Sequence, residues 1–298
     1  MTGGARAPGA VAVIGLGAMG LPMARALLRG GFAVRGYDVR PLAREAFTVD
    51  GGIAAETAQA ATAGATAVML MVVDAAQAEA ALFDEGALGA MAEDGVVVLT
   101  ATCPPAAVQA LAARVTASGR RFVDAPVSGG TAGATAGTLT VMVAGPAADI
   151  ATVRPIFEAI GKRIFIVGES PGQGAMVKTV NQLLCGAHIA VAAEGLALAR
   201  RLGLDGRVIL EVMGGSAAAS WMLNDRGPRM LAAHPEVSSA VDIFVKDLGI
   251  VLQAGRDSKT ALPIAALAHQ LFLAASGRGL GGEDDSQVIR CYEALFGT

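Results

Sequence analysis

Cysteine is scarce in this sequence, and its scarcity excludes two kinds of site. The 298 residues include only three cysteines, Cys103, Cys185 and Cys291, and no two of them form a CxxC pair. An odd number of widely spaced cysteines is poorly suited to a disulfide framework or a zinc site, so we expect neither. No cluster of His, Cys and carboxylate side chains suggests another metal. The pattern fits a reducing compartment, and we predict a cytoplasmic protein.

Charge is also sparse. Only 16% of the residues are charged, the net charge is −3, and 53% of the residues are hydrophobic. Such a composition argues against disorder, and a chain of 298 residues is long enough for two domains with buried cores. The basic residues form no stripe, so the sequence predicts no nucleic-acid partner and no attraction to anionic lipid.

Uninterrupted hydrophobic runs of membrane type are missing as well. Residues 10–28 are apolar, but three glycines and Pro22 interrupt them, which argues against a signal peptide. Residues 183–199 carry His188 and Glu194, which are costly inside a bilayer. We therefore expect no membrane association. The Gly- and Ala-rich residues 1–9 are expected to form a disordered tail.

The first half of the chain alternates short β-branched runs with helical patterns. Several runs are continuously apolar, which is typical of strands covered by helices on both faces. This alternation predicts an α/β fold, a doubly wound parallel sheet of the Rossmann type, over residues 10–170. The predicted strands lie near residues 10–15, 33–38, 66–73, 95–100, 121–125, 138–144 and 163–167. The predicted helices between them lie near residues 18–30, 75–82, 104–117 and 146–160.

The strand signal ends near residue 170. After a Pro-Gly-Gln-Gly breaker, Ala175–Arg201 contains no proline and is apolar nearly all round, so we predict one long buried helix. Residues 171–298 are therefore expected to form an all-α domain joined to the first through that helix, for substrate binding and oligomerisation. Further helices are predicted near residues 205–214, 241–257, 262–276 and 284–296.

A glycine motif directly follows the first predicted strand. Glycine inside a strand or helix costs roughly 0.5–1 kcal/mol of stability relative to alanine. Three glycines in one bend therefore indicate that the bend depends on backbone without side chains. In a G-x-G-x-x-G motif between a strand and a helix, the first glycine permits the turn, the second lets a pyrophosphate approach, and the third lets the helix pack closely. The predicted cofactor site therefore includes Gly15, Leu16, Gly17, Ala18, Met19 and Gly20.

The residue that ends the second predicted strand indicates which dinucleotide binds. Asp38 follows Gly20 by 18 residues, the position from which a carboxylate can accept hydrogen bonds from both ribose hydroxyls. The same carboxylate would repel a 2′-phosphate, and the nearest arginine, Arg40, comes two residues later. The sequence therefore favours NAD over NADP.

Three further motifs carry polar groups suited to chemistry. Ser128, Gly129 and Gly130 follow another predicted strand and offer a hydroxyl and bare backbone N–H groups to an anion. Lys178, Asn181 and Gln182 lie one turn apart on the long helix. Lys246 lies among apolar residues of a later helix. Each motif alone has an ordinary interpretation, as a turn, a solvated helix face or a lysine with a buried stem.

Taken together and in order, these motifs resemble the β-hydroxyacid dehydrogenase family. The resemblance covers nearly the whole chain and consists of G-L-G-x-M-G-x-P-M-A, D-A-P-V-S-G-G, G-x-G…K-x-x-N-Q and K-D-L-G. It implies a Rossmann domain and a helical domain with the active site in the cleft between them. It also implies that Lys178 is the catalytic acid/base, that residues 128–130 hold the substrate carboxylate, and that Asn181 or Gln182 orients the substrate. By the same resemblance Thr102 and Lys246 lie beside the nicotinamide, and Val72 and Val73 belong to the cofactor site.

The expected chemistry is hydride transfer with proton transfer to the lysine. A free lysine has a pKa of about 10.4 and would be a poor base at neutral pH. Partial burial and the positive charge of an oxidised nicotinamide would both lower that pKa toward the operating range. No metal is required for this reaction.

The substrate is expected to be a small hydroxy acid. Residues 181–205, 216–231 and 238–252 look more like the L-threonate dehydrogenase branch of the family than like its 3-hydroxyisobutyrate branch, which favours a sugar acid. The alternatives are a 3-hydroxyisobutyrate dehydrogenase, a tartronate semialdehyde reductase, and a dinucleotide-binding protein without catalysis. The high apolar content predicts a homodimer or homotetramer.

Overall fold

The computed structural model describes residues 9–295. The chain divides into two compact units, the first ending at Lys178 and the second beginning at Thr179. Most of the predicted N-terminal tail, residues 1–8, lies outside the described residues.

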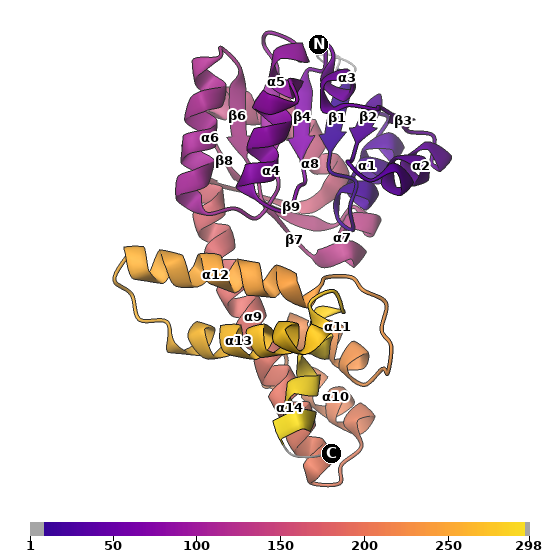
Figure 1. Ribbon diagram of the computed structural model, residues 1–298, viewed down its shortest axis with the longest axis vertical. Helices are drawn as coiled ribbons and strands as arrows, with labels where there is room; N and C mark the ends of the chain where they lie inside the picture. Colours follow the sequence, from indigo (N-terminus) through magenta and orange to yellow (C-terminus); the bar gives the residue numbers. More distant parts are fainter. Residues whose placement is uncertain (1–8, 296–298) are drawn as a thin grey trace, which may run out of the picture. The chain divides into compact units, whose positions relative to one another are not determined.

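The first unit is built on one nine-stranded sheet in the order β3-β2-β1-β4-β5-β6-β8-β7, with β9 beside β8 (Figure 1). Strands β1 to β6 pair in parallel, as predicted, and β8 runs antiparallel to β6 and β7 but parallel to β9. The strands are β1 (Val11–Ile14), β2 (Val34–Tyr37), β3 (Ile53–Ala54), β4 (Ala67–Leu70), β5 (Val96–Leu99), β6 (Arg121–Asp124), β7 (Val127–Ser128), β8 (Leu139–Ala144) and β9 (Gly161–Gly168).

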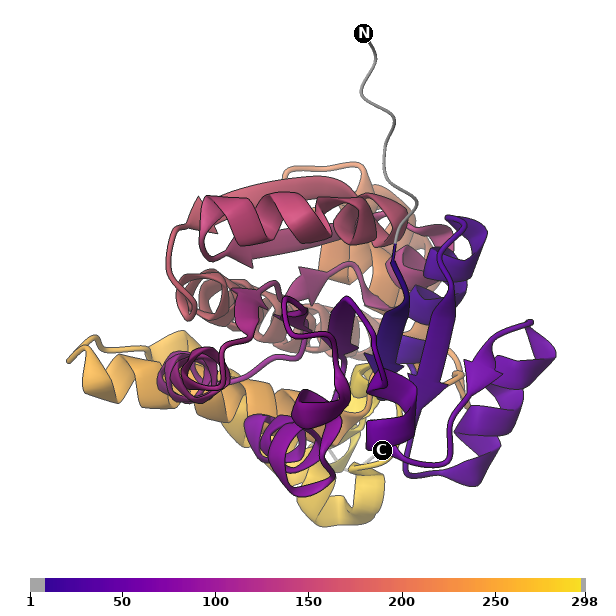
Figure 2. The same ribbon diagram turned by 90° about the horizontal axis from the view of Figure 1, so that it is seen from above.

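Helices cover both faces of this sheet (Figure 1 and Figure 2). They are α1 (Gly20–Arg29), α2 (Pro41–Val49), α3 (Ala58–Thr62), α4 (Ala75–Glu79), α5 (Ala87–Ala90), α6 (Pro105–Ala117), α7 (Gly130–Ala136) and α8 (Ala147–Ile160), with a π-helical turn, η1 (Ala80–Asp84), after α4. The predicted helix over residues 75–82 is therefore an α-helix that continues as a π-helix.

Alternate residues of each central strand enter opposite cores. On β1, Val11 and Val13 pack with α1 and α8, whereas Ala12 and Ile14 pack with α3 to α6. The period of two along a strand explains this division, and burial on both faces explains why these strands are continuously apolar in sequence. The predicted fold class is confirmed.

The second unit is helical within the described residues. Its elements are α9 (Gln173–Arg201, which begins in the first unit), α10 (Gly206–Gly214), α11 (Trp221–Met230), α12 (Val241–Asp257), α13 (Pro263–Ala275), the π-helical η2 (Ser276–Leu280), the 3₁₀-helical η3 (Asp285–Ile289) and α14 (Arg290–Leu295). The predicted final helix, residues 284–296, is thus a 3₁₀ turn followed by a short α-helix, and residue 296 lies outside the described residues.

Aromatic stacking and buried ion pairs hold these helices together. The rings of Phe244 on α12 and Phe272 on α13 stack with centroids 5.1 Å apart. The buried guanidinium of Arg226 donates to both carboxylate oxygens of Asp285, each at 2.9 Å, and fixes η3 against α11. A paired, bidentate contact is the form in which buried charges are tolerated.

The prediction that the long helix is buried was wrong for one of its faces. Val177, Leu184, Val191 and Leu198 repeat every seven residues on α9, and all four are exposed. Such spacing returns to the same side of a helix, so one apolar stripe of α9 is not covered by this chain. Among the described helices, α9 is also the one that is long and apolar enough to cross a membrane by length and composition, and half of that stretch is buried inside the protein.

Candidate functional site

The glycine bend between β1 and α1 has the geometry that the sequence predicted. Gly15 adopts φ +91°, and a Cβ there would lie 2.3 Å from the carbonyl oxygen of Met71. A Cβ on Gly20 would lie 1.8 Å from the carbonyl oxygen of Gly15. These two glycines are therefore required by the fold, because any side chain would collide with backbone.

Gly17 differs from its two neighbours. The nearest atom to a Cβ placed on Gly17 is the Arg40 guanidinium, 3.4 Å away, so this protein's own packing does not require a glycine. The bare backbone of Gly17 lies beside the start of α1, with the tip of the Arg40 side chain as its close neighbour, and a helix N-terminus favours negative charge. This cradle fits the pyrophosphate of a dinucleotide, and a side chain at Gly17 would fill it.

Asp38 is held at the carboxyl end of β2 by its neighbours. Its Oδ2 accepts from the backbone N–H of Leu16 at 2.8 Å, and its Oδ1 accepts from the backbone N–H of Arg40 at 2.9 Å. The Arg40 guanidinium also donates to both oxygens, at 3.0 and 3.2 Å. Burial by itself would raise the pKa of Asp38, but the hydrogen bonds from Arg40 and Leu16 outweigh it and lower the pKa. Asp38 is therefore a carboxylate at neutral pH, and its oxygens have the acceptor chemistry that the predicted ribose contact requires.

The other predicted cofactor residues of the first unit lie at the same edge of the sheet. Val72 and Val73 follow β4, and Thr102 follows β5. Val73 is exposed, and its N–H donates to the Gln77 side chain at 3.0 Å. Because β1, β2, β4 and β5 are parallel, their carboxyl ends meet at one edge, and the chain reverses direction across the sheet between β1 and β4. Open α/β sheets bind ligands at such a switch point.

Ser128, Gly129 and Gly130 join β7 to α7. Ser128 pairs with Thr140 of β8, and the two glycines adopt φ +132° and +63°. A Cβ on Gly130 would meet open space, so the backbone there is accessible. The segment can therefore present N–H groups and one hydroxyl to an anion, as the sequence predicted.

Lys178 lies in the second turn of α9 and is only 7% exposed. The start of the helix is bound by Asp124 of β6, whose Oδ2 accepts from the N–H groups of Gly172 and Ala175, both at 2.9 Å. No role was predicted for Asp124, although it is the first residue of the D-A-P-V-S-G-G motif.

Asn181, Gln182 and Lys246, all in the second unit, are linked by hydrogen bonds. The Asn181 amide donates to Gln182 Oε1 at 2.7 Å, and the Gln182 amide donates to the buried carboxylate of Asp247. Lys246 Nζ donates to the other Asp247 oxygen at 2.7 Å. Both ends of the Gln182 side chain are thus used within the protein, and Asp247, like Asp124, had not been predicted as part of the site. The K-D-L-G motif contained it, but only a contact 65 residues apart reveals its role.

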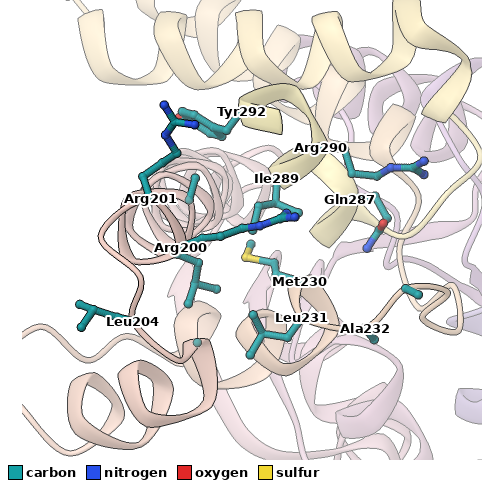
Figure 3. A pocket seen from close by; sticks show the side chains of 14 residues that line it. Arg200, Arg201, Leu204, Met230, Leu231, Ala232, Gln287, Ile289, Arg290 and Tyr292 are labelled. Atoms are coloured by element: carbon teal, nitrogen blue, oxygen red, sulfur yellow. The ribbon is translucent and has the colours of Figure 1, made fainter. Parts of the chain in front are cut away.

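Two cavities of the helical unit contain none of the predicted site residues. One, of about 500 Å³, lies between the C-terminal end of α9 and the region of η3 and α14, with Arg200 extended into it and Arg201 directed toward Tyr292 (Figure 3). The other, of about 400 Å³, is an apolar groove along α9 and α10. No group of three or more metal-ligating side chains occurs within residues 9–295.

A Rossmann unit with a glycine bend and an acid at the end of β2, followed by a helical unit, is typical of a dinucleotide-dependent oxidoreductase. Residues 10–168 match the NAD binding domain of 6-phosphogluconate dehydrogenase. Residues 172–292 match the domain described as NAD-binding of NADP-dependent 3-hydroxyisobutyrate dehydrogenase. The chain belongs to the 3-hydroxyisobutyrate dehydrogenase family of hydroxyacid dehydrogenases, as its motifs predicted, and its cofactor is NAD.

Individual relatives are similar over their whole length. L-threonate dehydrogenase of Cupriavidus necator is 43% identical over 286 residues, which cover 96% of each chain. NAD-dependent L-serine dehydrogenase of Pseudomonas aeruginosa is 34% identical over 295 residues, covering 96% of this chain and 99% of the relative. The crystal structure of 3-hydroxyisobutyrate dehydrogenase from Salmonella typhimurium aligns with a TM-score of 0.90 at 38% identity, covering 95% of this chain and 99% of that one.

Proposed function

We propose that this protein oxidises a four-carbon sugar acid of the L-threonate type with NAD, using Lys178 as the acid/base. The observation that carries the substrate class is the 43% identity with an L-threonate dehydrogenase across 96% of both chains. The hydroxyacid dehydrogenase class follows from the family, whereas the sugar acid is our inference.

Lys178 supplies the proton transfer in this proposal. Its neutral amine accepts the hydroxyl proton as the substrate C–H hydride departs, so the alcohol becomes a carbonyl and the amine becomes an ammonium. NAD, when bound, supplies the hydride acceptor. In the reverse direction the ammonium polarises the carbonyl and returns the proton. The burial of Lys178 supports this role, because the amine would react in a site of limited water access.

The remaining polar residues hold the reactants. Ser128, Gly129 and Gly130 bind the substrate carboxylate through the hydroxyl and bare N–H groups. Asn181 orients the substrate next to the lysine, whereas Gln182 keeps Asp247 in place, since both ends of its amide are already hydrogen-bonded.

We assign the nicotinamide end of the cofactor to the residues that follow β4 and β5 and to Lys246 on α12. Val72, Val73, Thr102 and Lys246 would line it, with Lys246 held by Asp247. The Rossmann domain is proposed to span residues 10–170, and residues 171–298 would bind substrate and form the subunit contacts.

The substrate proposal is tested by following NAD reduction with purified protein and a panel of hydroxy acids. The panel contains L-threonate, D-threonate, L-serine, glycerate and 3-hydroxyisobutyrate. We expect the highest kcat/KM with a four-carbon sugar acid. Turnover confined to 3-hydroxyisobutyrate would contradict the proposal and favour the second candidate function, which the Salmonella structure supports. Tartronate semialdehyde is assayed separately by following NADH oxidation, and turnover confined to it would favour a reductase.

The lysine role is tested by the substitution Lys178→Ala. General acid/base catalysis contributes typically about 10²- to 10⁴-fold, so kcat should fall by that factor while the Kd for NAD changes little. Lys162→Ala is the matched control, because Lys162 is an exposed lysine on β9 and should leave kcat unchanged. An unchanged kcat in Lys178→Ala would contradict the mechanism, and NAD binding without turnover of any hydroxy acid would favour a non-catalytic protein.

We further propose a cytoplasmic homo-oligomer, either a dimer or a tetramer. The apolar stripe on α9 that this chain does not cover supports self-association. The scarcity of cysteine supports a reducing compartment.

A further inference from the structure

Asp124 anchors the start of α9 from a distant strand. It ends β6 and is 1% exposed, and its Oδ2 accepts from backbone N–H groups 48 and 51 residues later in the chain. Its other oxygen, Oδ1, is buried without a hydrogen-bond partner. Burying a carboxylate with one unsatisfied oxygen costs free energy. We therefore infer that this contact does more than cap the helix.

Several other helices of this protein are capped locally, by a side chain at their own N-terminus. The side chains of Thr57, Asp74 and Ser220 each accept from a backbone N–H three residues later, at the starts of α3, α4 and α11. A local cap stabilises a helix end but does not fix its position relative to a sheet. The anchor from β6 does fix that position, because the carboxylate belongs to the sheet.

The helix start is shaped to admit this carboxylate. A Cβ on Gly174 would lie 2.7 Å from the carbonyl oxygen of Met142 on β8 and 3.0 Å from Asp124 Oδ2. The glycine therefore allows the first turn of α9 to lie directly against the sheet. Lys178 follows Ala175 by three residues, a rise of roughly 4.5 Å along the helix.

We propose that Asp124 is a positioning residue for Lys178, holding the first turn of α9 against the carboxyl edge of the sheet so that the amine keeps a fixed place relative to the cofactor residues there. This inference rests on the proposed role of Lys178. Asp124 itself transfers no proton, and it acts through the backbone of residues 172–175.

The test uses two substitutions that disturb the contact from opposite sides. Asp124→Asn removes the charge and replaces one carboxylate oxygen with an amide group, and Gly174→Ala inserts a methyl group between the helix and the sheet. Each should lower kcat by about 10- to 100-fold, the scale expected for a displacement near 1 Å. The Kd for NAD should change less than twofold, because the glycine bend follows β1, about 14 Å from β6 at ordinary strand spacing.

Asp284→Asn is the matched control. Asp284 is also fully buried and accepts from backbone N–H groups, those of Ser238 and Ser286, and none of its described hydrogen bonds reaches α9. Unlike Asp124, it is also paired with an arginine, Arg229, at 2.9 Å. This variant should lose thermal stability without losing kcat. If kcat fell in proportion to the loss of thermal stability in Asp124→Asn, Gly174→Ala and Asp284→Asn alike, the positioning role would be overturned.

A double-mutant cycle with Lys178→Ala separates positioning from general damage. If Asp124 acts through Lys178, adding Asp124→Asn to Lys178→Ala should not lower the residual rate further. Additive losses would overturn the inference. An unchanged kcat in Asp124→Asn beside a large loss in Lys178→Ala would overturn it while leaving the proposed function intact, whereas an unchanged kcat in Lys178→Ala would remove both.

Discussion

Arg40 occupies one side of the Asp38 carboxylate and lies 3.4 Å from where a Gly17 side chain would begin. A cofactor ribose must therefore compete with this guanidinium, most of which is exposed. The same guanidinium, once released, would lie within reach of a 2′-phosphate. We therefore expect the partner of Arg40 to influence the choice between NAD and NADP at this position.

We predict that Asp38→Ser shifts cofactor preference toward NADP. The substitution removes the carboxylate that repels a phosphate and frees Arg40 to bind one, and a charge-assisted contact of about 1.4 kcal/mol corresponds to tenfold. The ratio of kcat/KM for NADP to that for NAD should rise at least tenfold. The double variant with Arg40→Ala should lose that gain, and a gain that persists without Arg40 would contradict the explanation.

A second single-residue prediction concerns pH. Burial raises the pKa of Asp124 from its ordinary 3.8 to about 6, against the opposing effect of backbone N–H groups from residues 172, 174 and 175. Because the folded pKa is the higher one, the stability that this group contributes is fully present below pH 4 and is lost as the pH rises through 6. The total loss is about 3 kcal/mol.

The measurement is urea unfolding of the wild type and Asp124→Asn between pH 4 and 7.5. The free energy of unfolding of the wild type should fall relative to that of the variant by about 3 kcal/mol across this range. Asp124→Asn removes the titrating group, so parallel curves would contradict the raised pKa.

At the residue scale, the sequence was most informative where function depends on neighbouring residues. The spacing of Gly15, Gly20 and Asp38 follows from one β-α-β unit, and their geometry agrees with that expectation. The partners of Gln182 and Asp124 could not be predicted, because each contact joins residues about 50 or more positions apart. Local periodicity carries no information about such pairs.

At the scale of an element, the bend between β1 and α1 allows a matched pair of substitutions. Gly20→Ala places a methyl group 1.8 Å from a backbone oxygen and should destabilise the fold by about 1–3 kcal/mol or more. Gly17→Ala has room and should keep the stability of the wild type, yet raise the Kd for NAD at least about tenfold by filling the cradle. Thermal unfolding and fluorescence titration with NADH measure the two effects, and equal destabilisation by both variants would contradict this division of roles.

Elements were predictable according to their length and regularity. The continuously apolar strands β1, β4 and β5 and the helices α1, α6, α8, α10, α12 and α13 follow from hydrophobic patterning. Strands β3 and β7 have two residues each, which is too short for a periodic pattern. Helix α11 contains Gly227 and Pro228, which interrupt the helical pattern in its sequence. These short elements were missed because tertiary packing, rather than intrinsic preference, stabilises them.

The two-part organisation of the whole molecule could be predicted because the pattern changes from alternating strands and helices to helices alone near residue 170. The extent to which each face of the long helix is buried could not be predicted. A sequence that is apolar on all sides of a helix does not reveal which side packs within the chain and which side is left for another molecule. The exposed stripe of α9 is where that distinction matters.

We predict that the double substitution Val191→Asp with Leu198→Asp disrupts self-association. These side chains are 62% and 60% exposed and lie seven residues apart on the stripe, so charges there would be buried at any interface that covers it. Sedimentation velocity should show a dimer or tetramer for the wild type and a monomer for the variant. The control, Leu42→Asp with Val49→Asp, changes two apolar residues of α2 that are still more exposed, at 77% and 88%, and should not alter the sedimentation coefficient. Val191 and Leu198 belong to the second unit, whereas the glycine bend belongs to the first, so the monomeric variant should still bind NAD. A wild type that sediments as a monomer would contradict the assignment of the stripe to self-association.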